Sequence, residues 1–347
     1  MVSEHSLILG HFPLPVGTAG HYGEVENQGD SPARQASEQE RLAVASIYGP
    51  IEHQMVQVEE RLDHVIDNAP PRIAGELAHA LKGGGKRLRP ALTLLAGSFH
   101  NGGSESVVYA ATAIELLHTA TLVHDDSIDN ALLRRGRLTV NRLWGNHDAV
   151  FLGDYLCSAS AYVAAETGNV QAMAVFSKTL SDLCRGAARE HTANSRLCRD
   201  EYFLTIGGKT AALFRAATES GALLSGAPKK MVRWLKDYGY NLGMAFQIVD
   251  DIHDVASDLA RGILNLPALL VLEGPGGSEV GQALERDREK GLRLISDRAG
   301  SPAILEECRR MARSFRYRAS AALHPLPRKA AYESLVKLAG FLTERQG

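Results

Sequence analysis

The sequence predicts an all-α protein, a bundle of about ten to twelve helices with no sheet. From about residue 40, Ala, Leu and Glu are abundant, and the alternation of β-branched residues that marks strands is scarce. Two long helical stretches each end in an acidic sequence. Breakers rich in Gly, Pro and Asn recur at helix-length intervals, at 70–71, 83–85, 101–103, 207–208, 228 and 274–277.

Residues 1–39 are rich in Gly, Pro, Ser, Glu and His and show no sustained period, so we expect a disordered N-terminal extension. Residues 40–347 are expected to form one helical domain, since 45% of the chain is hydrophobic and can fill a large core. Its two most informative helices are predicted at about 106–128 and 229–254.

The two acidic sequences read Asp-Asp-Ser-Ile-Asp and Asp-Asp-Ile-His-Asp. On a helix the first and fifth positions lie one turn apart on the same face, so each box can bind one cation. Clustered carboxylates repel one another unless a positive charge lies between them. The predicted metal ligands are therefore the aspartates of both boxes: Asp125, Asp126, Asp129, Asp250, Asp251 and Asp254.

These ligands favour magnesium over zinc, because carboxylate oxygens are hard and no paired Cys or His lies nearby. Magnesium usually completes its coordination with water and substrate phosphate. The boxes therefore indicate a diphosphate held between two acidic helices, at the mouth of a deep apolar pocket.

The composition excludes several other classes of protein. A net charge near −2 and a pI near 6.7 give no basic surface for nucleic acid or an anionic membrane. The four cysteines form no CxxC pair, as expected for reduced thiols in a cytoplasmic protein. We expect no stable membrane insertion, because no apolar run approaches the roughly 20 residues of a membrane span. The N-terminus also lacks the regions of a signal peptide.

Four further motifs accompany the boxes: Gly-Gly-Lys-Arg-Leu-Arg-Pro at 84–90, Arg-Arg at 134–135, Gly-Gly-Lys-Thr at 207–210 and Phe-Gln at 246–247. These motifs and the boxes occur in the same order as in the all-trans polyprenyl (isoprenyl) diphosphate synthases, and residues 40–345 therefore resemble this family. The resemblance implies the isoprenoid synthase fold, Mg²⁺ as cofactor, and isopentenyl diphosphate and an allylic diphosphate as substrates. It also implies a homodimer, with a heteromer as the alternative.

By this resemblance Lys86, Arg89 and His118 bind the head group of isopentenyl diphosphate, for which a lysine beside an arginine fork is well suited. Arg134 is expected to contact the allylic diphosphate, and Arg135 the isopentenyl one.

The second half of the chain carries the other predicted contacts. Lys209 and Thr210 resemble the family's clamp on the allylic diphosphate, and Lys209 joins the aspartates in the predicted catalytic set. Gln247 is expected to be a polar contact to the substrate.

Product length is predicted from the helix that leads to the first box. In this family a bulky aromatic four or five residues before the first aspartate stops chain growth early. Thr121 and Ala120 occupy these positions and are small, whereas Leu117 and Ile114 are the next bulky residues. A product longer than farnesyl is therefore expected.

The sequence departs from the family pattern in three places. The motif GExxQ reads Gly-Ala-Ala-Arg-Glu at 186–190, and the Gly-Lys loop after the second box is missing. Ile263 replaces a common lysine, and Asn265 replaces a threonine. These losses leave a second hypothesis open, a non-catalytic or weakly active regulatory subunit of a heteromeric prenyl synthase. A terpene cyclase ranks lower, because it would not need the basic residues predicted for isopentenyl diphosphate.

Overall fold

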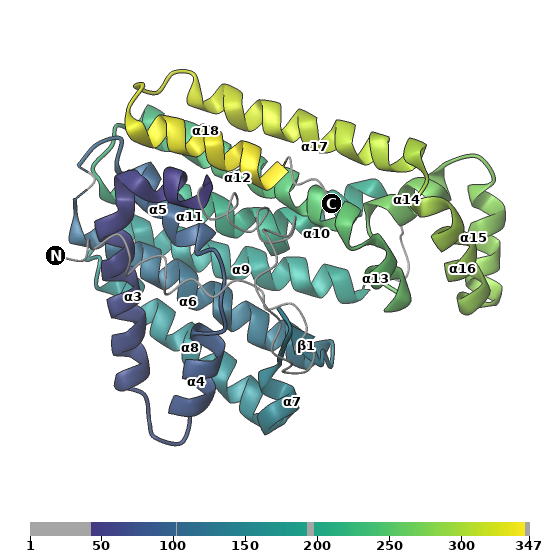
Figure 1. Ribbon diagram of the computed structural model, residues 1–347, viewed down its shortest axis with the longest axis horizontal. Coiled ribbons are helices and arrows are strands. Elements are labelled where there is room, and N and C mark those ends of the chain that lie inside the picture. Colours follow the sequence, from purple (N-terminus) through teal and green to yellow (C-terminus); the bar gives the residue numbers. More distant parts are fainter. Residues whose placement is uncertain (1–42, 102, 193–197, 344–347) are drawn as a thin grey trace, which may run out of the picture. The chain divides into compact units, whose positions relative to one another are not determined.

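The computed structural model describes residues 43–101, 103–192 and 198–343, and they are almost entirely helical (Figure 1). The all-α prediction is confirmed; the disordered extension expected at 1–39 lies outside the described residues. After residues 43–48, which are helical, come η1 (Gly49–Ile51), α3 (Glu52–Asp67), α4 (Ala74–Leu81), α5 (Leu88–Gly97), α6 (Glu105–Ile128), β1 (Leu133–Arg134), β2 (Arg137–Leu138), α7 (Val140–Trp144), α8 (Asn146–Ala165) and α9 (Val170–Thr192).

The second half of the chain continues the pattern. Its elements are α10 (Arg199–Ile206), η3 (Gly207–Ala211), α11 (Ala212–Leu224), α12 (Lys229–His253), α13 (Val255–Ala260), α14 (Leu266–Glu273), α15 (Gly277–Arg286), α16 (Arg288–Ala299), α17 (Pro302–Leu323) and α18 (Ala330–Thr343).

The two helices predicted to carry the boxes are confirmed as α6 and α12, with bounds close to those expected. The helices of the described residues outnumber the ten to twelve predicted, because short ones such as α7 and α13 were not distinguished. At 207–208 the glycines do not interrupt the chain's helical course. Instead η3 is a π-helix that joins α10 to α11, a widened turn often found at functional sites.

One small hairpin corrects the prediction of no sheet. β1 and β2 pair antiparallel, with Leu133 opposite Leu138 and Arg134 opposite Arg137. The two residues between the strands, Arg135 and Gly136, have φ of 52° and 74°. This is the backbone that a tight hairpin turn requires.

The described residues divide into two compact units. The first contains the residues up to Met173 together with Ser220–Pro228 and Arg328–Leu335, and the second contains the rest. The first box lies in the first unit and the second box in the second. The single helical domain expected at 40–347 stays a prediction.

In the first unit α6 is the central helix, and it packs along α8 (Figure 1). A Cβ added to Gly153 of α8 would lie 2.0 Å from the His124 ring of α6, so only glycine allows this close approach. By length and composition α6 could span a membrane, which contradicts the prediction that no apolar run is long enough. However, 72% of its most apolar window is buried inside the protein, as in a core helix.

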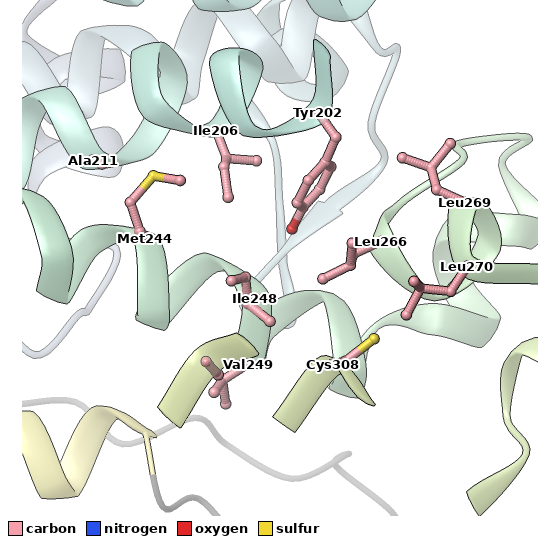
Figure 2. Close-up of a cluster of buried hydrophobic side chains, with 11 residues drawn as sticks. Tyr202, Ile206, Ala211, Met244, Ile248, Val249, Leu266, Leu269, Leu270 and Cys308 are labelled. Atoms are coloured by element: carbon pink, nitrogen blue, oxygen red, sulfur yellow. The ribbon is translucent and has the colours of Figure 1, made fainter. Parts of the chain in front are cut away.

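In the second unit α12 runs beside α17 (Figure 1). Around α12 a buried hydrophobic cluster gathers residues of α10, η3, α14 and α17, which Figure 2 shows as sticks. Tyr202 extends from α10 into this cluster with its hydroxyl pointing inward (Figure 2). Gly239 and Gly243 lie on the face of α12 that contacts the backbone of Phe214 and Ala211, where a side chain would clash.

Candidate active site

The first acidic box occupies the last turn of α6 and the residue that follows it. Asp125 is half-buried, Asp126 is buried, and Asp129 is exposed. Arg134 of the hairpin donates to both oxygens of Asp126, from Nε and NH2 at 2.7 Å each. The middle carboxylate is thus bound by a two-pronged arginine, which offsets the cost of burying its charge.

Arg87 organises the predicted isopentenyl diphosphate segment. It has a left-handed backbone (φ 49°) at the N-cap of α5. Its guanidinium donates to Glu59 and Glu115 at 2.7 and 2.8 Å, and to the carbonyl of Leu81 at 2.8 Å. Arg87 lies between Lys86 and Arg89 in the sequence. Its ion pairs therefore hold in place the backbone that carries the Lys86 and Arg89 side chains.

Arg89 and His118 are brought together as predicted. Arg89 NH1 lies 2.9 Å from Nε2 of His118. Arginine can only donate, so Nε2 accepts and the imidazole is neutral. Burial, followed by the positive charges of Arg89, Arg135 and Arg134, holds the pKa of His118 well below its usual value. His118 therefore orients Arg89 and adds no charge to this basic cluster.

The hairpin also places Arg135 in this cluster. Its guanidinium donates to the carbonyl of Gly84. A Cβ on Gly85, whose φ is 142°, would lie 2.5 Å from Arg135 NH1, so the glycines of the segment allow the arginine to cross close to the backbone. In the first unit the structure therefore joins the basic segment, His118 and the Arg-Arg pair.

In the second unit Lys209 lies in the π-helix η3, close to α9. A Cβ on Gly186 would lie 2.4 Å from the backbone nitrogen of Lys209, and one on Gly208 would lie 2.8 Å from the carbonyl of Asp182. The two glycines thus let α9 and η3 touch. One turn after Gly186, Glu190 accepts a salt bridge from Lys209. The altered GExxQ motif therefore gives the predicted clamp lysine an acidic partner.

The second box has the same pattern of burial as the first. Asp250 is half-buried, Asp251 is buried, and Asp254 is exposed. The hydroxyl of Tyr202 and the amide of Gln247 donate to Asp251 at 2.7 and 2.8 Å. Burial raises the pKa of Asp251 to about 7, although both hydrogen bonds act to lower it.

Thr210 is joined to the second box by the same network. Its hydroxyl donates to the Gln247 amide oxygen at 2.7 Å, and the amide nitrogen of Gln247 donates to Asp251. The predicted clamp segment and the predicted metal ligands of the second unit are therefore linked by continuous hydrogen bonds.

The donor set suits magnesium, although the box residues are not assembled into a three-ligand site. Among the described residues no three His, Cys, Asp or Glu side chains are arranged to hold a metal ion. Magnesium commonly uses only one or two carboxylates and keeps its waters and substrate phosphates. The first and fifth positions of each box lie one turn apart on the same helix face, and the fifth is exposed in both boxes, so these two positions are the candidates for holding the ion.

The predicted product-length residues differ in how far they are buried. Ala120, Leu117 and Ile114 are almost completely buried, at 0%, 0% and 3% exposure. Thr121 is half-buried, and its hydroxyl donates to the carbonyl of His118 at 2.7 Å. On a helical wheel Thr121 shares the stripe of His118 and Asp125, while Ala120 lies about 130° around the helix from that stripe.

Comparison with known proteins shows the family of this chain. Residues 70–262 match the model of the family described as polyprenyl synthetase. The chain is 37% identical over 244 residues to heptaprenyl diphosphate synthase component 2 of Geobacillus stearothermophilus, covering 67% of this chain and 76% of the relative. The chain therefore belongs to the polyprenyl synthetase family.

Solved structures share the fold. A decaprenyl diphosphate synthase from Rhodobacter capsulatus superposes with a TM-score of 0.81 at 33% identity, covering 87% of this chain and 98% of that one. A polyprenyl synthase from Caulobacter crescentus, complexed with calcium and isoprenyl diphosphate, gives a TM-score of 0.80 at 30% identity, covering 88% and 98%. The predicted family and the all-α isoprenoid synthase fold are confirmed.

Several residues that shape the site were not predicted from the sequence. They are Arg87, Glu59, Glu115, Glu190 and Tyr202. The only signal for Glu190 was the departure from the GExxQ pattern. The other four act through partners far away in the sequence, which no local motif indicates.

We expect Glu190→Gln to lower the KM for the allylic diphosphate about two- to fivefold, with kcat little changed. A partly exposed ion pair contributes about 0.2–1 kcal/mol, and its removal releases Lys209 for the substrate. Steady-state kinetics with each substrate varied in turn measures the effect, with Glu285→Gln, an exposed change on α15, as the control. A large fall in kcat would instead mean that Glu190 takes part in catalysis.

Proposed function

We propose that this chain is an all-trans polyprenyl diphosphate synthase, a prenyltransferase that condenses isopentenyl diphosphate with an allylic diphosphate to a product longer than farnesyl. The observation that carries the proposal is the matched arrangement of the two acidic boxes. In each, the second aspartate is buried and bound by protein donors, while the fifth is exposed. Family membership and the names of the relatives, heptaprenyl and decaprenyl diphosphate synthases, support the product class.

Magnesium would be held by the first and fifth aspartates, Asp125 and Asp129 in one box and Asp250 and Asp254 in the other. When bound, magnesium neutralises the diphosphate and withdraws electron density from it. The calcium in the Caulobacter crescentus structure supports a role for divalent cations in the family.

The basic residues of each unit supply the remaining charge. Arg89, oriented by neutral His118, and Arg135 bind the head group of isopentenyl diphosphate together with Lys86. Lys209 donates to the allylic diphosphate after it leaves Glu190. Such charge-assisted hydrogen bonds to phosphate are stronger than neutral ones.

The reaction is an electrophilic chain elongation. The C–O bond of the allylic diphosphate breaks, and the electron pair leaves with the diphosphate. The double bond of isopentenyl diphosphate attacks the allylic cation, so that a new C–C bond forms. A proton is then lost from the adjacent carbon to the departing diphosphate. Water must be excluded throughout, because it would trap the cation.

The regulatory-subunit hypothesis has a further observation in its favour, beside the missing Gly-Lys loop. One relative is named as component 2 of a heptaprenyl diphosphate synthase, which points to a heteromeric enzyme. All six box aspartates are nevertheless present, and the second of each box is bound as described. A catalytic chain is therefore the better reading, whether it works alone or with a partner.

Asp125→Asn and Asp250→Asn should each lower kcat by at least about 100-fold, because each leaves diphosphate and metal charge uncompensated. The purified chain is assayed alone with magnesium and both substrates. Asp237→Asn, an exposed aspartate of α12, is the control and should keep near-normal activity. Turnover within tenfold of the unmutated protein in either box variant would reject the two-box assignment, and an inactive unmutated chain would favour the regulatory subunit.

Thr121→Phe should shift the products to shorter chains. A long apolar product gains about 0.8 kcal/mol for each buried methylene, and an aromatic side chain on the stripe below Asp125 would block its path. Thr121→Val, which keeps the shape of the side chain, is the control. Ala120→Phe should instead lower the melting temperature, since Ala120 has no exposed surface. Chromatography of the dephosphorylated products tests the shift in chain length, and an unchanged product distribution in Thr121→Phe would contradict the prediction.

We propose a homodimer that uses the outer face of α8. Phe151 and Tyr162, 67% and 69% exposed, are eleven residues apart and so share one face of this helix. Light scattering of the purified chain at micromolar concentration should give twice the mass of 37.5 kDa, and Phe151→Glu should halve it. A monomer in the unmutated chain would refute this assembly.

All four cysteines are free, which supports the predicted cytoplasmic location.

A further inference from the structure

A fourth aspartate extends the second acidic box. Helix α13 begins directly after Asp254, and the backbone N–H of Asp258 donates to the Asp254 carbonyl at 2.8 Å. Asp258 is buried, at 9% exposure. Asp250, Asp254 and Asp258 therefore follow one another at four-residue intervals, and this end of the second unit carries more negative charge than the box alone.

Arg261 provides the positive charge at this place. Its NH2 donates to Oδ1 of Asp258 at 2.5 Å, while its side chain remains 55% exposed. Burial, followed by the charge of Asp258, raises the pKa of Asp254, while Arg261 and His253 act to lower it. Arg261 is also the only lysine or arginine between residues 254 and 285.

Buried hydrogen bonds fix the position of this arginine relative to the box. The side-chain amide of Asn265 donates to Oδ2 of Asp258 at 3.0 Å and to the backbone carbonyl of Asp251 at 3.3 Å. Both oxygens of Asp258 are thus engaged, one by Arg261 and one by Asn265. Asn265 thus links the Asp258–Arg261 ion pair to Asp251, the residue whose carboxylate accepts from Tyr202.

The chain turns tightly after α13. The backbone N–H of Ile263 donates to the carbonyl of Asp258 at 2.9 Å, and Gly262 has a φ of 76°. The chain therefore ends the helix tightly and returns to α14 within a few residues. Arg261 stands two residues before Ile263, the position that lacks the lysine common in the family.

We propose that Arg261 is a diphosphate-binding residue, which donates to the allylic diphosphate at the second box while Asp258, itself held by Asn265, keeps its guanidinium in place. It supplies the charge that Ile263 does not. A planar guanidinium has five N–H donors, so it can bind a carboxylate on one edge and a phosphate oxygen on another. This inference rests on the proposed function, because it assumes that a diphosphate is the ligand of this box.

The test combines kinetics with direct binding. Arg261→Ala should raise the KM for the allylic diphosphate about tenfold, in the range expected for losing one charge-assisted hydrogen bond. The KM for isopentenyl diphosphate should change less than about twofold. Arg261→Lys should recover most of the loss, and adding Ile263→Lys to Arg261→Ala should recover part of it. Arg293→Ala, an exposed ion-paired arginine of α16, is the control.

Calorimetry with inorganic diphosphate and magnesium measures the same contact without turnover. The unmutated chain should bind, and Arg261→Ala, still folded at the assay temperature, should bind about tenfold more weakly. An active, diphosphate-binding chain in which Arg261→Ala behaves as the unmutated protein would overturn the role of Arg261 alone. A loss affecting both substrates equally, without rescue by lysine, would show a merely structural role. Absence of both turnover and binding in the unmutated chain would overturn the proposed function and this inference together.

Discussion

The buried carboxylate in the middle of each acidic box is the constraint on which the site depends. A buried charge is costly unless donors compensate it, and the cost of an unpaired one reaches several kcal/mol. Asp126 is compensated by the fork of Arg134, and Asp251 by Tyr202 and Gln247. These pairings fix the orientation of each helix end about its axis. The fifth aspartate remains exposed in both boxes.

The same pairings connect the boxes to the phosphate-binding groups. In the first unit Arg134 is followed by Arg135, which reaches the carbonyl of Gly84 in the basic segment. In the second unit Gln247 accepts from Thr210 of the π-helix. Each unit thus couples its predicted metal ligands to its predicted diphosphate ligands, so that a shift in one displaces the other.

The departures from the family pattern are organised features of the structure. Glu190 follows the glycine that lets α9 approach the π-helix, and it pairs with the clamp lysine. Beyond the second box, Asn265 holds Asp258, and Asp258 pairs with an arginine two residues before the position where a lysine is missing. Alternating charges keep such a site near neutrality, which explains how a chain with a shortened loop can keep its aspartates without excess repulsion.

The sequence alone determined the fold class, the family, and the two box helices with their ends. Helical periodicity and terminal residues are local properties, and α6 and α12 were therefore predicted to within one or two residues. The motifs also indicated the association of Arg89 with His118, and this contact was found.

The tertiary structure decided how deeply each box aspartate is buried and which side chains support the site. Arg87 meets Glu59 and Glu115, each 28 residues away, and Tyr202 meets Asp251 across 49 residues. The face that Ala120 presents also depends on what packs around α6. Such contacts arise from the packing of helices against one another, and the spacing of residues within a single helix carries no information about its neighbours.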